Sequence, residues 1–312
     1  MKNLLIIVLF LTLSFLKADM PLYNLVENDK PTCLERLKEA NDAELWNVFL
    51  GIQADLFFDQ EVRWIEQETW WSQAQRVFEI GSGNGAYLSR LADKFQEKAF
   101  QGIEKLPMLA KQSNENFAGI RLGFQEGDAE VFNSQWVNLA DVILFRLTLQ
   151  HLSDSTAALQ NAWRYLTPGG HVLIIDSCDM ARRSSHPIIA IQEALQLVAE
   201  RQREKGKGNR RVTLDLLKAL ESKKGPLSDL YEVTFSNLNS EGEILCEIIR
   251  FEGELDRRRS FNQGLLFLNI LHRTHQIPVD LSAAYDQLKV YLQDETAWSS
   301  PGIHFLVLKK KS

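Results

Sequence analysis

A loop with three glycines lies directly after a short apolar run, and it is the feature of this chain best suited to hold a ligand. Residues 79–85 read EIGSGNG, so glycine occupies every second position from Gly81 to Gly85. Glycine lets the backbone turn sharply and approach a bound molecule closely. Dinucleotide sites normally space their glycines as GxGxxG. Here the third glycine arrives one residue early and Glu79 precedes the loop, and a carboxylate there suits an ammonium group better than a pyrophosphate.

Two further acids follow the next apolar runs. Glu104 ends the run 99–104, where a carboxylate can accept both hydroxyl groups of a ribose. Asp128 follows the run 120–125, where it can accept from the amino group of an adenine. One acid at the end of a strand is commonly structural. Three acids in register with a glycine loop indicate a site for a positively charged nucleoside.

These residues need a scaffold that brings the ends of separate strands to one edge. Short apolar runs alternate with amphipathic runs, which predicts crossover connections and a parallel, doubly wound sheet. In open sheets of this kind, ligands bind outside the carboxyl ends of the strands. We expect strands at 77–80, 99–104, 120–125, 141–146 and 171–176, with helices at 87–95, 106–117 and 155–166.

The flanking regions have mostly helical patterns. We expect helices at 32–59, 61–71, 188–202, 213–221, 261–275 and 281–292, and strands at 231–238 and 303–309. Residues 241–251 are ambiguous between strand and helix, and the basic stretch 203–211 is interpreted as a solvated linker. The aromatic residues Trp64, Trp70 and Trp71 either pack a helix against the sheet or floor a substrate cavity.

The expected fold class is therefore α/β, a Rossmann-like doubly wound and mostly parallel sheet with N-terminal helices and a C-terminal helical cap insertion. The predicted domains are a signal peptide or anchor at 1–18, a helical extension at 19–72, a ligand-binding core at 73–180, and a helical cap at 181–312 whose final strands complete the sheet.

The N-terminus reads as a secretory signal or an uncleaved anchor. Lys2 precedes an apolar run that starts at Leu4 and ends before Lys17; it is short for a membrane-spanning helix and matches the hydrophobic region of a signal peptide. Cleavage after Ala18 predicts a secreted or periplasmic protein. Without cleavage, the alternative is a cytoplasmic domain that meets the membrane only through residues 1–18.

The composition of the 312-residue chain narrows the choice of partners. Hydrophobic residues make up 45% and charged residues 24%, as in a soluble globular protein with a real core. The formal net charge of −6 offers no general attraction for phosphate backbones, so no nucleic-acid partner is expected. Cys33, Cys178 and Cys246 lack CxxC spacing, so we expect at most one disulfide and no zinc site. No group of His, Asp and Glu has metal-ligand spacing, and no metal is expected.

Taken in order, these segments resemble class I S-adenosylmethionine-dependent methyltransferases, especially the small-molecule type described as type 11 or UbiE-like. The motifs are VFEIGSGNG at 77–85, GIEKLPML at 102–109, GDAE at 127–130, LFRLTLQHL at 144–152 and LTPGG at 166–170. The resemblance covers about residues 73–180 and implies S-adenosylmethionine as the cofactor. It implies cofactor contacts from Glu79, Gly81, Ser82, Gly83, Gly85, Glu104, Lys105, Asp128, Ala129 and Arg146.

The resemblance also implies a role for each group. The three glycines approach the methionine part of the cofactor, and Glu79 lies near its ammonium group. Glu104 binds the ribose. Asp128 and Ala129 lie at the adenine, and Arg146 lines the methyl site.

The expected function is methyl transfer to a small-molecule acceptor by in-line displacement, because the sulfonium already activates the methyl group and the protein has only to align the reactants. His151 is the candidate general base; a structural histidine that caps the following turn is the alternative. Three other functions stay open: a protein methyltransferase acting outside the producing cell, a non-catalytic S-adenosylmethionine-binding protein, and a nicotinamide-dependent oxidoreductase.

Overall fold

The computed structural model describes residues 21–311 and divides them into two compact units. The sheet unit comprises Phe57–Ser184, Ala199–Arg250 and residues 299–311; the helical unit comprises residues 21–56, Ser185–Val198 and Phe251–Trp298. The predicted signal or anchor at 1–18 lies outside the described residues. Within the described part of the chain, no helix has both the length and the apolar character needed to span a membrane.

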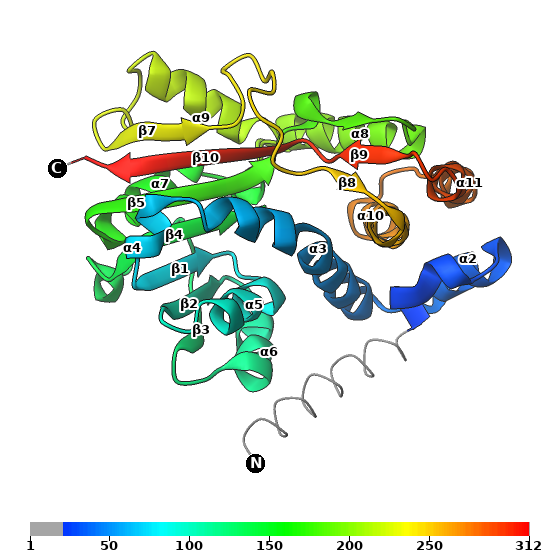
Figure 1. Ribbon diagram of the computed structural model, residues 1–312, viewed down its shortest axis with the longest axis horizontal. Coiled ribbons are helices and arrows are strands. Elements are labelled where there is room, and N and C mark those ends of the chain that lie inside the picture. The colour runs from blue at the N-terminus through cyan, green and yellow to red at the C-terminus, as the bar shows by residue number, and fades with distance from the viewer. Residues whose placement is uncertain (1–20, 312) are drawn as a thin grey trace. The chain divides into compact units, whose positions relative to one another are not determined.

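A seven-stranded sheet is the framework of the sheet unit (Figure 1), with the strand order β3-β2-β1-β4-β5-β10-β7. Its strands are β1 (Arg76–Ile80), β2 (Ala99–Glu104), β3 (Leu122–Glu126), β4 (Ala140–Arg146), β5 (Leu166–Ser177), β7 (Tyr231–Ser236) and β10 (Ile303–Lys310). Neighbours among β1 to β5 pair in parallel, whereas β10 pairs antiparallel with both β5 and β7. The predicted mostly parallel, Rossmann-like sheet is therefore confirmed.

Helices make three of the connections between the parallel strands, and each returns the chain to the same edge. They are α5 (Ala86–Lys94), α6 (Pro107–Phe117) and α7 (Ser155–Tyr165). Pro107 occupies the first turn of α6, where a missing N–H has no partner to lose. Asp154 caps α7, since its side chain accepts from the backbone N of Ala157 at 2.9 Å. The carboxyl ends of β1 to β4 consequently lie along one rim.

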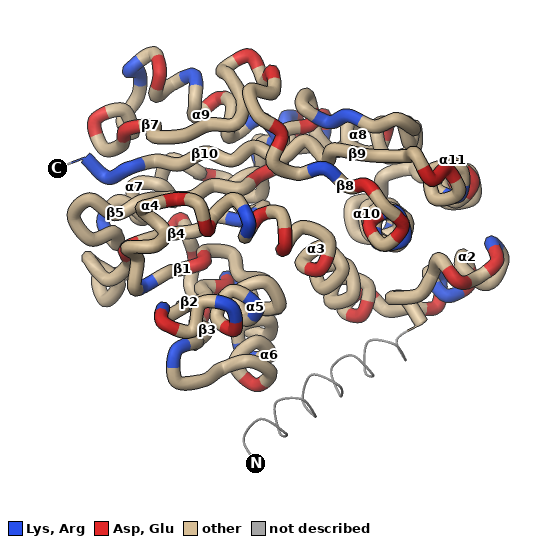
Figure 2. The backbone as a smooth tube through the Cα atoms, in the orientation of Figure 1, with Lys and Arg blue, Asp and Glu red and all other residues tan. Residues whose placement is uncertain are grey.

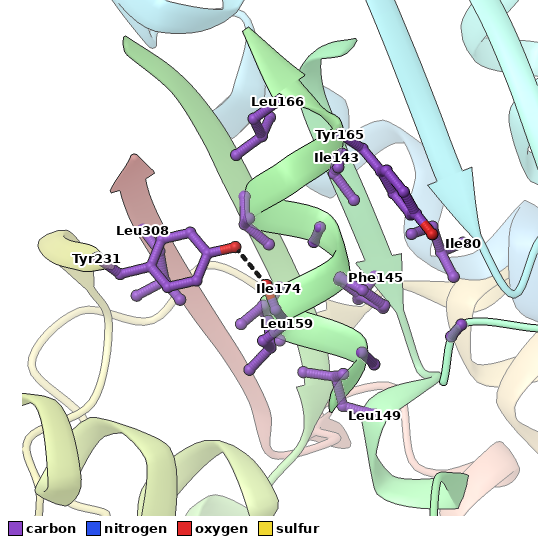
Figure 3. Close-up of a cluster of buried hydrophobic side chains, with 14 of the residues drawn as sticks. Ile80, Ile143, Phe145, Leu149, Leu159, Tyr165, Leu166, Ile174, Tyr231 and Leu308 are labelled. Carbon is purple, nitrogen blue, oxygen red and sulfur yellow. Dashed lines mark hydrogen bonds between the residues drawn. The ribbon is translucent and has the colours of Figure 1, made fainter. Parts of the chain in front are cut away.

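One face of the sheet packs on α7 and on α9 (Val212–Glu221). Figure 3 shows part of the buried hydrophobic cluster between this face and the helices. The strand residues Phe145 and Ile174 are fully buried in this layer. Tyr231 of β7 reaches α7, where its hydroxyl donates to the carbonyl oxygen of Leu159 at 2.7 Å. This layer holds β4 and β5, whose carboxyl ends carry part of the rim.

The opposite face of the sheet is covered by aromatic residues that follow one another along the chain. The ring of Trp64, in α3 (Asp42–Ile65), lies 5.1 Å from that of Phe305 in β10. The ring of Trp70, in α4 (Thr69–Gln73), stacks on His171 of β5 at 5.6 Å. Trp64 and Trp70 thus pack against the sheet, as in the first of the two interpretations above.

The helices before the sheet differ from the prediction. The expected helix at 32–59 is broken at Ala40, whose ψ of 141° is not helical. Asn41 then starts α3 by accepting from the backbone N of Glu44 at 2.9 Å. The expected boundary near residue 60 is absent, because α3 continues to Ile65 before α4 begins. A capping side chain inside an apolar pattern explains the first difference.

The helical unit has its own apolar core. It contains α2 (Lys30–Glu39), α10 (Glu254–His275), α11 (Leu281–Gln293) and parts of α3 and of α8 (Ile189–Lys205). Phe261 and Leu265 of α10 are fully buried in this core. Asn262 accepts from the backbone N of Val26 at 2.9 Å, and Asn269 donates to the carbonyl of Leu37 at 3.0 Å. These two amides satisfy backbone groups that the apolar core would otherwise leave unpaired.

The remaining elements are short. They are η1 (Pro21–Glu27), η2 (Ser134–Trp136), η3 (Leu149–His151), η4 (Asp179–Ala181), β6 (Arg183–Ser184), β8 (Phe251–Glu252) and β9 (Trp298–Ser300). Cys33, Cys178 and Cys246 are all free thiols. Among residues 21–311, no cluster of three or more His, Cys, Asp or Glu side chains is arranged to hold a metal ion.

Candidate active site

The glycine loop is folded by left-handed backbone angles. Gly81, Gly83 and Gly85 have φ values of 79°, 57° and 75°, which residues with a Cβ rarely adopt. The loop is tied to β2, since the backbone N of Gly81 donates to the carbonyl of Ile103 at 2.8 Å. A Cβ on Gly81 would lie 2.4 Å from Oγ1 of Thr148, so glycine is required there by space as well as by conformation.

Glu104 joins the glycine loop to the loop after β2. Its Oε2 accepts from the backbone N of Gly83 and its Oε1 from the backbone N of Leu106, both at 2.9 Å. The side chain is buried. Each oxygen keeps a second lone pair, so this carboxylate can hold the loop and accept from a ligand at the same time.

Asp128 and Lys105 form the outer part of the rim. The Lys105 ammonium lies 2.8 Å from Oδ2 of Asp128, and the backbone N of Glu130 donates to Oδ1 at 3.0 Å. Burial opposes ionisation, but the ammonium and this N–H together hold the pKa of Asp128 below its ordinary value. Ala129 is buried, and its carbonyl accepts from the amide of Asn161 at 3.0 Å. Asp128 is therefore an ionised acceptor at the rim.

Glu79 lies deeper, at the carboxyl end of β1, and is only 2% exposed. Its Oε2 has no hydrogen-bond partner in the described part of the chain. Burial raises the pKa of this carboxyl group to about 8; Arg146 opposes the shift, whereas the charges of Glu61 and Glu104 add to it. Without a cationic ligand beside it, Glu79 is mostly protonated at neutral pH.

Arg146, at the end of β4, is held by groups that the motifs do not include. Its Nε donates to both carboxylate oxygens of Glu61, at 2.9 and 3.2 Å. Its guanidinium lies over the ring of Tyr87, 4.1 Å from the centroid. Its Nη2 is buried and has no partner among residues 21–311. Sequence reasoning missed Glu61 and Tyr87; the signal for Glu61 was an acid at i+4 from Phe57 on an apolar helix face.

A second polar network lies at the carboxyl ends of β4 and β5. The buried Asp176 accepts from the backbone N of Gln150 at 3.1 Å and of Ser177 at 2.8 Å. Arg210 donates to Gln150 at 2.9 Å and pairs through two nitrogens with Asp179, at 2.5 and 2.7 Å. The prediction of a solvated linker at 203–211 is wrong in this respect, since α8 continues to Lys205 and Arg210 is anchored at the rim.

The structure thus brings the predicted cofactor residues to one edge of one sheet. Gly83 contacts Glu104 directly, and the backbone N of Gly127, next to Asp128, donates to the carbonyl of Glu104 at 3.0 Å. Ser82, in the loop, is buried, and its Oγ has no partner among the described residues. His151 is exposed and lies in η3, directly after β4.

Comparison with known proteins gives a family match over this region. Residues 72–223, just under half of the chain, match the family model described as a methyltransferase domain. Phosphoethanolamine N-methyltransferase 3 from Arabidopsis thaliana is 29% identical over 105 residues, which cover 33% of this chain and 21% of that protein. Aclacinomycin 10-hydroxylase RdmB from Streptomyces purpurascens is 31% identical over 116 residues, which cover 35% of this chain and 30% of that protein.

Among solved structures, the plantazolicin methyltransferase BpumL in complex with SAH is 13% identical, with a TM-score of 0.48, over 96% of this chain and 98% of that one. The chain matches less than a third of the length of either curated relative. One of those relatives is named as a hydroxylase, so the reaction has to be argued from the site.

Proposed function

We propose that this chain transfers the methyl group of S-adenosylmethionine to a small-molecule acceptor, because residues 72–223 match the model of the methyltransferase domain family. The family match agrees with the resemblance read from the motifs and supports the methyltransferase class. The observation that carries the proposal is a set of buried polar atoms at the carboxyl ends of the strands that lack hydrogen-bond partners among residues 21–311. They are Oε2 of Glu79, Nη2 of Arg146 and Oγ of Ser82. A buried polar atom without a hydrogen-bond partner destabilises the folded protein, so these atoms are suited to hydrogen bonds with a bound ligand.

The rim offers a group for each part of the donor. The glycine loop allows close approach of the methionine part, and the bare carboxylate oxygen of Glu79 suits its ammonium group. Glu104 has lone pairs left for the ribose hydroxyls. Asp128, paired with Lys105, and the neighbouring Ala129 form the adenine side.

The chain would act mainly by alignment. S-adenosylmethionine supplies a methyl group that its sulfonium charge has already activated. Holding an acceptor atom in line with that methyl group can contribute about 7–11 kcal/mol through effective concentration. The acceptor side is bounded by the ends of β4 and β5, where the network of Gln150, Asp176 and Arg210 fixes the loops.

His151 is the candidate base on the acceptor side. This exposed residue lies in η3, next to the end of β4, where an acceptor O–H or N–H would meet it. We expect His151→Ala to lower turnover by about 10²–10⁴-fold without changing the affinity for S-adenosylhomocysteine. Unchanged turnover with an identified acceptor would remove this role.

A small-molecule acceptor is favoured by the relative named as a phosphoethanolamine methyltransferase. A nucleic-acid acceptor has no support, because the net charge is −6 and Asp and Glu are interspersed with Lys and Arg along the chain (Figure 2). A protein acceptor outside the producing cell is the alternative. The hydroxylase relative gives a reason to test a second candidate, a chain that binds the donor without transferring its methyl group.

The test is a titration followed by a transfer assay. Isothermal titration of the full chain with S-adenosylhomocysteine and with NADH should show binding of the first only; the reverse would indicate an oxidoreductase. The protein is then incubated with methyl-labelled S-adenosylmethionine and fractionated small-molecule extracts. Label recovered on an extract component supports the proposal, whereas tight donor binding with no labelled product from small molecules or proteins indicates a non-catalytic binder.

We also propose that the protein is exported, to the periplasm or beyond, on the basis of the apolar run at residues 4–16. The alternative is a cytoplasmic domain held by an uncleaved anchor. N-terminal sequencing of the native protein after cell fractionation decides between them. A mature chain that begins at Asp19 in an exported fraction supports export, and an intact N-terminus in the membrane fraction supports the anchor.

A further inference from the structure

Glu61 is a carboxylate with no exposed surface, on the buried and otherwise apolar face of the last turns of α3. Its helix neighbours Phe57, Val62 and Ile65 are all buried. A carboxylate in such surroundings is costly unless it is paired and hydrogen bonded. Both of its oxygens accept from Nε of Arg146, so the pair holds one edge of the guanidinium in a fixed position.

The other contacts of Arg146 leave the nitrogen Nη2 without a partner in the described part of the chain. The guanidinium lies near two aromatic rings, 4.1 Å from the centroid of Tyr87 and 5.7 Å from that of Phe57. Nε is taken by Glu61, whereas the buried Nη2 has no partner among residues 21–311. A buried cationic N–H that lacks a partner is suited to an anion, above all to a carboxylate.

A bare acceptor lies in the same cluster. β1 and β4 are paired neighbours with Glu79 opposite Leu144, so Arg146 lies two residues further along the same face of the adjacent strand. Oε2 of Glu79 is also without a partner in the described part of the chain. The unpaired donor Nη2 of Arg146 suits the anionic group of a zwitterion, and the unpaired acceptor Oε2 of Glu79 suits its cationic group. The donor of the proposed reaction ends in such a group, an α-ammonium beside an α-carboxylate.

We propose that Glu61 is a positioning residue for the donor: it fixes Arg146 so that Nη2 receives the donor's carboxylate while Oε2 of Glu79 receives its ammonium. This inference rests on the proposed function. It makes α3, which lies before the family match at residues 72–223, part of the donor site. It also predicts discrimination between ligands that carry the amino-acid end and ligands that lack it.

The test compares two ligands on the full chain and on matched variants. S-adenosylhomocysteine carries the amino-acid end, and 5′-methylthioadenosine has the same nucleoside without it. Glu61→Gln keeps the shape of the side chain but removes the negative charge that holds the guanidinium of Arg146. We expect it to weaken the binding of S-adenosylhomocysteine by about 10- to 100-fold. The affinity for 5′-methylthioadenosine should stay within a factor of about two, because the nucleoside contacts are unchanged. Glu66→Gln is the control, since Glu66 is an exposed acid paired with Lys94.

Equal losses for both ligands in Glu61→Gln would mean that the pair only holds α3 in place, and would overturn the inference. Unchanged binding of S-adenosylhomocysteine would overturn it as well. If the variant fails to fold, the inference can still be tested on the unchanged protein. The decarboxylated analogue of S-adenosylhomocysteine should bind to it about 10- to 100-fold more weakly than the parent compound. Equal affinities would contradict the inference. If the unchanged protein binds none of these ligands, the proposed function itself fails.

Discussion

The charge of Glu79 depends on what lies beside it. Burial raises the pKa of its carboxyl group to about 8, and the positive charge of Arg146 opposes that shift only in part. In the unliganded protein the protonated form therefore dominates below pH 8. A ligand with an ammonium group favours the ionised form, so binding must release a proton wherever Glu79 starts protonated.

We expect the affinity for S-adenosylhomocysteine to rise with pH, by about tenfold per unit below pH 7, and to level off above pH 8. The sign follows from the raised pKa, because a higher pH removes the proton that binding would otherwise displace. Isothermal titration across this range measures the slope. In buffers of different ionisation enthalpy, the same titrations should show about one proton released per ligand at pH 6.5.

Glu79→Gln is the matched variant, since its amide keeps the size of the side chain and does not titrate. Its affinity should be lower at pH 8 and should lack the slope assigned to Glu79. The amino group of the ligand titrates in the experiments on both proteins, so its contribution to the pH dependence of the affinity is the same and cancels in the comparison. The same slope in both proteins would show that Glu79 does not face the ammonium group.

At the scale of single elements, the short helix α4 depends on a buried lysine. Lys98 is 2% exposed, and its ammonium donates to the carbonyl of Trp71 at 2.9 Å and of Ala74 at 2.7 Å. A positive charge at the C-terminal end of a helix is favourable, and here it also satisfies two backbone acceptors. Lys98 thereby links α4 to the start of β2.

We expect Lys98→Met to lower the free energy of unfolding by about 2–5 kcal/mol, because the methionine fills the space but leaves two carbonyls without this donor. Lys94→Met is the control: Lys94 is 41% exposed and pairs with Glu66 at 2.9 Å, so its loss should cost less than about 1 kcal/mol. Urea unfolding followed by circular dichroism measures both. Equal losses in the two variants would contradict the role given to Lys98.

At the scale of the whole molecule, the sheet is closed by the last strand in the chain. β10 pairs with β5 on one side and with β7 on the other, so β7 joins the sheet only through β10. The side chains from Phe305 to Leu308 are fully buried. The sheet unit therefore forms only after its most distant segments have met, which delays the long-range pairing in folding.

Removal of residues 303–312 is expected to abolish cooperative unfolding. β7 would lose the strand with which it pairs, and the hydrophobic core on both faces of the sheet would be exposed to water. Removal of residues 311–312 alone should cost only about 1–2 kcal/mol, since it deletes two hydrogen bonds of the exposed residue Lys311: from its backbone N to the carbonyl of Leu230 and from its Nζ to the carbonyl of Ser228. Thermal unfolding and limited proteolysis compare the two truncated chains. A cooperative transition in the shorter chain would show that β10 is dispensable.

Much of the fold and part of the site follow from local pattern. A strand such as β4 is a continuous apolar run, and α5 has a helical repeat, so both are encoded in a few neighbouring residues. The glycine loop and the acids Glu79, Glu104 and Asp128 could be placed at one rim, because parallel strands with crossover helices put their carboxyl ends together. The family match over residues 72–223 followed from the same motifs.

The tertiary structure alone decided the groups that lie far apart in the chain. Arg146 and Glu61 are separated by 85 positions, and no periodicity links them; the pair exists because α3 packs where β4 ends. Arg210 reaches Gln150 and Asp179 in the same way, although its own segment resembles a linker. Local sequence specifies the period and the turns of each element, whereas the partner of a buried charge is specified by which elements the apolar core brings together.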